Sequence, residues 1–171
     1  MKNIACLFLV ALAIVFANTS IAQTEEDLVE QGKKFIAEAN YEEAVKIFNT
    51  VIENNPNNYN ALYQRGFAYN LLQKFDIAQE DFKKVISLKP SHQWAYKNLG
   101  MEYAKTEQHD LAIENFNKVL ELDPNNTDAL INRGFAKKAM GDEKEACKDF
   151  NKAKKLGSKE AKIILKNNYC K

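Results

Sequence analysis

The sequence predicts an all-α protein, a right-handed solenoid built from tandem helix–turn–helix repeats. The first observation is a period of 34 residues, kept by all three prolines and by four of the six glycines. The second is that alanine and phenylalanine columns share this register. The repeating positions are Pro56, Pro90 and Pro124; Gly32, Gly66, Gly100 and Gly134; Ala44, Ala78, Ala112 and Ala146; and Phe48, Phe82, Phe116 and Phe150. Four residue types in one register indicate stacked copies of one supersecondary unit.

Residues 1–22 differ from the rest of the chain and read as a secretory signal peptide. Lys2 precedes a continuous apolar run over residues 4–17, and small residues lead to a predicted cleavage site between Ala22 and Gln23. The apolar run is shorter than the roughly 20 residues of a bilayer-crossing helix, so a retained anchor is the weaker alternative. We therefore expect an exported protein of the bacterial cell envelope, periplasmic or secreted, with no transmembrane span after cleavage.

The rest of the chain has the size of one ordinary domain and is nearly neutral. The whole sequence carries 24 basic and 23 acidic residues, and only Lys2 lies in the predicted signal. We see no basic cluster of the kind that binds nucleic acid or an anionic membrane surface. Neither partner class is expected.

Residues 93–126 form the clearest repeat. Tyr96, Leu99 and Tyr103 recur at helical spacing and predict a first helix, and Phe116 belongs to a second helix of the same kind. A polar turn over residues 106–110 separates the two helices, with Asp110 as the expected cap of the second. Pro124 cannot continue a helix, so the unit ends there.

The same columns divide the chain into four repeats and a cap. The predicted repeats are residues 23–58, 59–92, 93–126 and 127–158. The fourth departs at Lys137, which replaces an aromatic residue, and at Gly157-Ser158, which replaces the closing proline. A ninth helix is expected over residues 159–168, inside a capping segment over 159–171, because a solenoid needs a terminal element with a polar outer face.

The order Y-x-x-L-G-x-x-Y, A-x-x-x-F, P resembles the tetratricopeptide repeat family, with Tyr96 where that family often has tryptophan. The resemblance covers nearly all of the chain after residue 22. It implies that the first helices of successive repeats line a concave groove, in which a partner binds as an extended segment or a helix. Function is then recognition of a protein or peptide, as a non-enzymatic scaffold.

The candidate groove residues are those that vary between copies. Amides can pair with any peptide backbone, and large apolar side chains are typical interface anchors. The alternative is that these side chains pack against the next helix; we expect the amides to be exposed more often than the aromatics. The predicted groove residues are Asn60, Tyr63, Gln64, Phe67, Trp94, Lys97, Asn98, Met101, Asn132 and Phe135.

Two cysteines remain after the signal, Cys147 and Cys170. An even count in an exported protein favours a disulfide that fastens the cap to the fourth repeat; two free thiols are the alternative.

Other functions have less support in the sequence. Lys97, Asn132, Lys162 and Lys166 partly match the family's carboxylate clamp, but Met101 stands where an asparagine is needed. His92 and His109 fall in turns, and no phosphate loop or metal-ligand spacing occurs, so we expect no enzyme, no cofactor, no metal and no small-molecule substrate. The alternative hypothesis is a structural protein that self-associates, through end-to-end stacking of repeats or exchange of the cap. The third hypothesis is a thiol-redox protein or another enzyme.

Overall fold

The computed structural model describes residues 25–167 and 170. The predicted signal peptide and its cleavage site lie outside these residues. The chain divides into two compact units, Met1–Leu72 and Gln73–Lys171. Every described residue in a regular element is helical.

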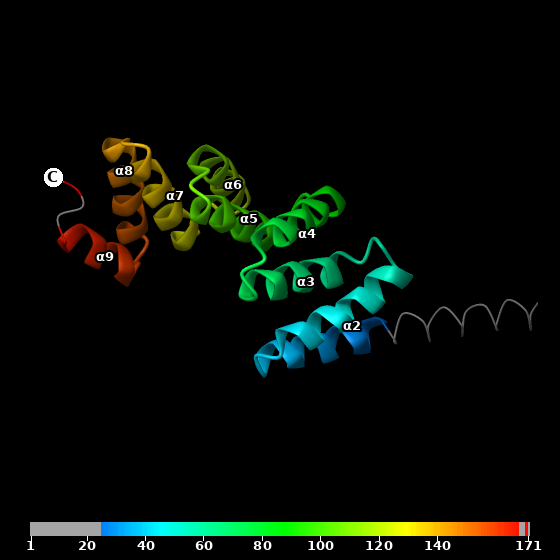
Figure 1. The fold of residues 1–171 in the computed structure, drawn as a ribbon. Helices are drawn as coiled ribbons and strands as arrows, with labels where there is room; N and C mark the ends of the chain where they lie inside the picture. The colour runs from blue at the N-terminus through cyan, green and yellow to red at the C-terminus, as the bar shows by residue number, and fades with distance from the viewer. Residues whose placement is uncertain (1–24, 168–169, 171) are drawn as a thin grey trace, which may run out of the picture. The chain divides into compact units, whose positions relative to one another are not determined.

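The first unit contains a helix over residues 25–37, followed by α2 (Tyr41–Asn54) and α3 (Tyr59–Leu71) (Figure 1). Consecutive helices pack against each other because each buries one apolar stripe. Phe48 and Val51 of α2 are completely buried in this unit's core, together with Ala61 and Ala68 of α3.

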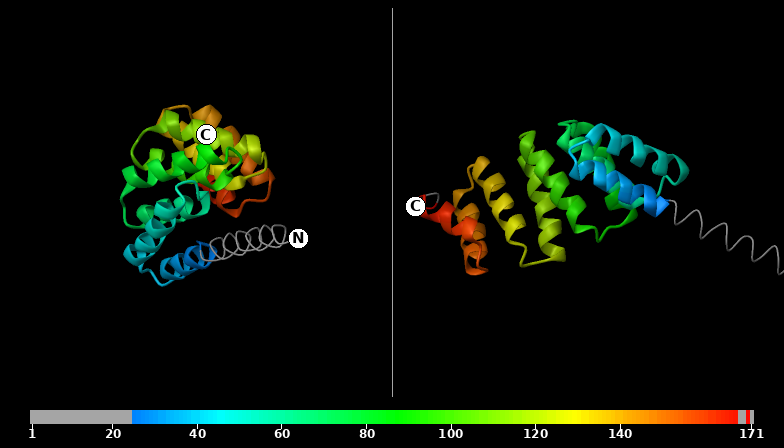
Figure 2. Two further views of the ribbon diagram at one scale, coloured as in Figure 1. Left: turned by 90° about the vertical axis from the view of Figure 1, so that its right-hand side faces the viewer. Right: turned by 90° about the horizontal axis from the view of Figure 1, so that it is seen from below.

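The second unit contains six helices, and each packs on the one that follows it (Figures 1 and 2). They are α4 (Phe75–Leu88), α5 (Gln93–Lys105), α6 (His109–Leu122), α7 (Thr127–Ala139), α8 (Glu143–Lys155) and α9 (Lys159–Lys166). A further contact joins α5 to α7, which are the first helices of successive predicted repeats.

The glycine and phenylalanine columns are packing positions. A Cβ atom added at Gly100 would lie 2.9 Å from the Phe116 ring, and one at Gly134 would lie 2.6 Å from the Phe150 ring. Both rings are completely buried. Glycine is therefore needed so that the two helices of a repeat can approach closely across a phenylalanine ring.

The helix ends follow local chemistry. Lys89 and Asp123, each before a proline, leave the helical region with φ of −139° and −141°. Asn126 accepts a hydrogen bond from the Ala129 backbone N–H and caps α7. The prediction that Asp110 caps the second helix of its repeat is wrong: α6 begins at His109 after Gln108, whose side chain makes no capping hydrogen bond. Asp110 lies in the first turn instead, where a carboxylate favours the helix dipole.

The turn between the two helices of a repeat requires one residue in the left-handed region. Gly141 holds this position before α8 with φ of 86°, and Glu107 holds the equivalent position before α6 with φ of 59°. The N–H of Gln108 then donates to the Tyr103 carbonyl at 2.8 Å, which closes the end of α5.

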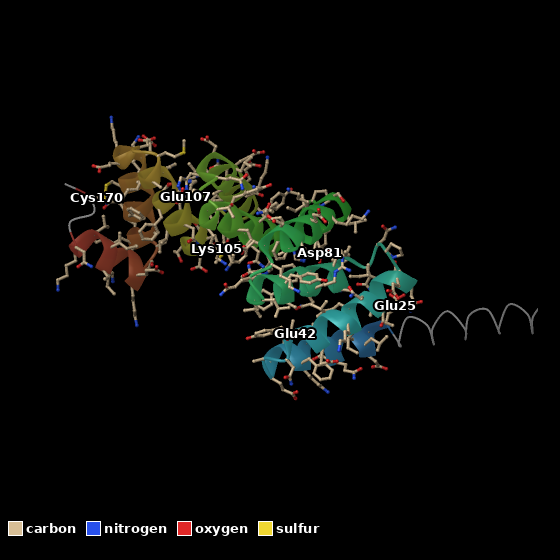
Figure 3. The ribbon with its side chains drawn as sticks, viewed as in Figure 1. Glu25, Glu42, Asp81, Lys105, Glu107 and Cys170 are labelled. Atoms are coloured by element: carbon tan, nitrogen blue, oxygen red, sulfur yellow. A yellow bond between two sulfur atoms is a disulfide. The ribbon has the colours of Figure 1, made fainter. Side chains whose placement is uncertain are left out.

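The cap is shorter than predicted, since α9 ends at Lys166. Its Ala161 and Ile164 are buried against Leu130 and Phe150 of the last helix pair. Cys170, which follows α9, forms a disulfide with Cys147 of α8 with sulfur atoms 2.06 Å apart (Figure 3). The predicted cysteine pair is thus joined, and the bond links the segment after α9 to the last repeat.

Candidate binding surface

The predicted groove residues fall on three first helices, one in the first unit and two in the second. On α3, Asn60 is exposed, whereas Tyr63, Gln64 and Phe67 are half-buried. Asn60 also lines a pocket of about 320 Å³ between α3 and the helix over residues 25–37. The first unit therefore presents Asn60 to solvent, and the other three contribute partly to packing.

On α5 the predicted residues differ sharply in exposure. Trp94 is 56% exposed, whereas Asn98 is only 8% exposed. Lys97 and Met101 are half-buried between these extremes. The expectation that amides are more exposed than aromatics is wrong on this helix. An amide can be buried at low cost once its polar atoms are paired, so its polarity alone does not place it at the surface.

Trp94, Lys97 and Asp128 form the best-defined constellation of the second unit. The Lys97 ammonium lies 4.4 Å from the centroid of the Trp94 ring, within the range of a cation–π contact. The same Nζ atom lies 3.4 Å from Oδ2 of Asp128 on α7. The Lys97 side chain is 17% exposed, whereas that of Asp128 is 63% exposed. A half-buried lysine therefore connects an exposed indole ring to an exposed carboxylate on the next first helix.

On α7, Phe135 and Asn132 occupy the predicted surface in different ways. Phe135 is 38% exposed, and its ring lies edge-on to the buried Phe150 at 5.2 Å between centroids. Asn132 is half-buried. Phe135 thus combines packing on its own repeat with an exposed ring edge, so both alternatives given in the sequence analysis apply to it.

A small pocket of about 270 Å³ lies beside Trp94, lined also by His92 and Gln93. His92 caps α5 by accepting a hydrogen bond at Nδ1 from the Ala95 N–H at 3.2 Å. Burial, together with the positive charge of Lys89, holds the pKa of His92 below its ordinary value of 6.5. Its imidazole is therefore neutral at pH 7 and acts as a structural cap.

A polar network inside the fourth repeat was not predicted from the sequence. Arg133 of α7 donates to Asp149 of α8 through Nε at 2.9 Å and Nη2 at 2.6 Å. Lys137 donates to the same carboxylate at 2.8 Å, and Arg133 Nη1 donates to Asn117 of α6 at 2.6 Å. The Lys137–Asp149 contact explains why position 137 holds a lysine where the other repeats hold an aromatic residue. A usable signal was present, since arginine recurs at 65 and 133 and aspartate at 81 and 149.

A buried carboxylate on α5 was also missed. Glu102 is completely buried, and its Oε1 lies 3.1 Å from the Lys105 ammonium. Lys105 also lies 4.8 Å from the centroid of the Phe75 ring of α4. The equivalent positions in neighbouring repeats are Ala68 and Ala136, so the repeat pattern gave no indication of a carboxylate here.

The described residues gather no group of three or more histidine, cysteine or acidic side chains that could hold a metal ion. Within the same part of the chain, every helix is too short or too polar to cross a bilayer. The arrangement on α5 and α7 is suited instead to contact with another chain, through an exposed aromatic ring, a lysine and a carboxylate.

Comparisons with known proteins agree with this architecture. Three family models described as tetratricopeptide repeat match residues 28–58, residues 59–92 and 94–126, and residues 115–148. Together they span more than half of the chain. The protein belongs to the tetratricopeptide repeat family, and the predicted all-α solenoid class is confirmed. No curated protein matches the sequence significantly.

Several solved structures are similar. A crystal structure of MamA has a TM-score of 0.76 and 27% identity and covers 81% of this chain and 81% of its own. MamA from Desulfovibrio magneticus RS-1 has a TM-score of 0.73 and 28% identity, with 77% and 75% covered. The first tetratricopeptide domain of Spaghetti (RPAP3), bound to the HSP90 peptide SRMEEVD, has a TM-score of 0.68 and 28% identity, with 70% and 94% covered.

Proposed function

We propose that the protein is a non-enzymatic binding module that holds a segment of a partner protein on the first helices of its repeats. The observation that carries this proposal is the exposed Trp94 ring, held by Lys97 at 4.4 Å. Tryptophan is among the residue types that most often dominate binding energy. The similar domain of RPAP3 was solved with a bound peptide, which is a precedent for segment binding by this fold.

The chemistry of the surface specifies the kind of segment that fits. Trp94 and Met101 offer apolar contact, and the Lys97 ammonium offers a positive charge to a partner carboxylate. Its present partner, Asp128, is 63% exposed although the Lys97 side chain is only 17% exposed, so the Asp128 carboxylate can turn into solvent while Lys97 stays in place. A carboxylate of the partner can therefore replace Asp128 at little cost. The proposed ligand is a segment with an acidic residue next to a large apolar one.

We place this module in the bacterial cell envelope because residues 1–22 have the pattern of a secretory signal. The test is to identify the first residue of the protein after it is recovered from the cell that produces it. Mass spectrometry should find the chain beginning at Gln23 in the envelope fraction, and a chain that begins at Met1 in the cytoplasm would contradict the placement.

Binding is tested by photo-crosslinking in the cell. Photo-reactive residues at Trp94 and Phe135 should give crosslinks to a specific protein. The matched control is Leu111 on α6, which is 39% exposed against 38% for Phe135 but lies on a second helix. Crosslinks at Leu111 with none at Trp94 or Phe135 would move the binding surface to the second helices. An excess of a peptide containing adjacent acidic and aromatic residues should suppress the Trp94 crosslink.

A further inference from the structure

The outward face of the cap helix α9 combines an apolar side chain with lysines. Ala161 and Ile164 point into the core and are 0% and 7% exposed, whereas Ile163 is 61% exposed. Lys159, Ile163 and Lys166 are four and three residues apart, so they share the face opposite the core. Lys162 flanks this stripe. An exposed isoleucine among lysines adds nothing to the core of its own chain.

The near-neutral total charge hides a strong asymmetry along the sequence. Residues 152–167 contain six lysines and one glutamate, whereas residues 25–43 contain seven carboxylates and two lysines. The expectation that no basic cluster occurs is therefore wrong for the end of α8 and for α9. The first and last parts of the repeat array carry opposite charge.

The first unit contains a pocket whose lining complements the outward face of α9. The pocket has a volume of about 320 Å³ and brings together Glu25, Glu26 and Glu30 with Val29 and one lysine. That lysine, Lys33, lies 3.2 Å from Oε2 of Glu30, so the lining carries three carboxylates against one ammonium group. Val29 is 7% exposed and belongs to the core of the first unit, so only a small apolar edge of it reaches the pocket. Oε2 of Glu25 accepts hydrogen bonds from Asn55 Nδ2 at 3.1 Å and from Asn58 Nδ2 at 2.9 Å, which hold this carboxylate in place (Figure 3).

We propose that the outward face of α9 docks into the acidic pocket of a second copy of the chain. Ile163 lies over the exposed edge of Val29. The lysines around it pair with Glu26 and displace Lys33 from Glu30, whose ion pair with Lys33 is exposed. A second copy is the proposed partner because the same chain carries both the lysine-rich face of α9 and the acidic pocket, so any two copies offer complementary charges. The contact joins two different surfaces, and it therefore links copies head to tail, as a closed ring or an open chain.

The ionic part of this contact gives it a defined salt dependence. Exposed charges interact over about 10 Å in 0.1 M salt and about 3 Å in 1 M salt. The average molecular mass of the protein should therefore rise with concentration at low ionic strength. The association constant should be at least tenfold smaller at 1 M salt. An association driven mainly by apolar contact would keep or gain strength under the same change.

The experiment is a charge exchange followed by analytical ultracentrifugation of the purified full-length chain. The variants Lys159→Glu/Lys162→Glu and Glu26→Lys/Glu30→Lys should each associate with themselves at least tenfold more weakly than the natural chain. An equimolar mixture of the two should associate again, in assemblies that contain the two variants in equal amounts, because the cap of each variant then complements the pocket of the other. Lys84→Glu, an exposed lysine of α4, is the matched control and should behave like the natural chain.

Three results would overturn the proposal. They are a natural chain that stays monomeric at the highest soluble concentration, a mixture that forms no complex, and an Ile163→Gln variant that associates as strongly as the natural chain. The last variant changes only an exposed side chain, so it should fold normally. Association caused by residues 1–22 would survive all these substitutions. Because the substitutions leave α5 and α7 unchanged, the Trp94 crosslinks test the proposed function independently.

Discussion

Removing Asp149 should expose the cost of the buried charges in the fourth repeat. The Asp149 side chain is 6% exposed, and it pairs with Arg133 at 2.6 Å and Lys137 at 2.8 Å. Taking away one partner of a buried ion pair costs about 3–5 kcal/mol, because the remaining charge has neither water nor a counter-ion. Arg133 and Lys137 are 20% and 16% exposed and keep part of their hydration. We therefore expect Asp149→Ala to destabilise the protein by roughly 3 kcal/mol, the lower end of that range.

The chain itself supplies the compensating variant. The third repeat solves the same packing problem without ions, through Leu99, Tyr103 and Asn115 at the equivalent positions. The triple variant Arg133→Leu/Lys137→Tyr/Asp149→Asn copies this set. Replacing a buried ion network by packed residues of similar volume is often neutral, so the triple variant should lie within about 1 kcal/mol of the natural chain.

The assay is urea unfolding followed by far-ultraviolet circular dichroism, with midpoints compared at a common slope. Lys118→Ala is the control, because its pair with Glu121 is exposed and its loss should leave the unfolding midpoint almost unchanged. The reasoning is refuted if Asp149→Ala loses less than about 1 kcal/mol, or if the triple variant is as unstable as the single one.

Three further predictions concern the packing at Gly134, the His92 N-cap of α5 and the Cys147–Cys170 disulfide. Gly134→Ala should cost about 1–3 kcal/mol in urea unfolding, because the new Cβ would lie 2.6 Å from the Phe150 ring; Lys144→Ala, an exposed position on α8, should change little. The pKa of His92 is lower in the folded chain than in the unfolded one, so its capping contribution is present above pH 6.5 and is lost as the pH falls through the lowered pKa. His92→Asn, which copies Asn58 and Asn126, should abolish this part of the acid sensitivity in melts between pH 7 and about pH 5. Reduction of the Cys147–Cys170 bond, which closes a sequence separation of 23 residues, should lower stability by about 3 kcal/mol; Cys147→Ser/Cys170→Ser should then be insensitive to reductant.

The repeat period predicted the fold well because it reports positions where geometry permits few residues. Gly134 must be small because the Phe150 ring lies beside it, and Pro124 follows the end of a helix. Each repeating column therefore marks a position where local geometry allows few residue types. Glu107 at φ of 59° could not be foreseen, since nothing in its side chain favours the left-handed region. In this conformation its own N–H donates to the Ala104 carbonyl at 3.2 Å, and the next N–H donates to the Tyr103 carbonyl at 2.8 Å.

The candidate surface was predicted less completely than the fold. Variation between repeats identified Trp94 and Phe135 correctly as partly exposed positions, but it placed Asn98 on the surface, where the structure buries it. Variable columns contain both exposed residues and alternative solutions to internal packing, and spacing does not separate the two. Arg133 and Asp149 are variable residues that serve internal packing, because they form an ion pair with each other inside the fourth repeat.

Trp94 is the position where the fold and the proposed function can be separated most cleanly. The same column holds Glu26, Asn60 and Asp128 in the other repeats, so the fold accepts a polar side chain there. An indole ring that stays 56% exposed gains only part of the stabilisation that burial would give. Trp94→Asn should therefore lower the unfolding free energy by only about 1–2 kcal/mol, through the loss of the cation–π contact with Lys97 and of the buried part of the ring. The same change should remove most of the retention of the partner identified by crosslinking. A variant that unfolds readily but still retains the partner would show that Trp94 serves packing and that recognition lies elsewhere on the chain.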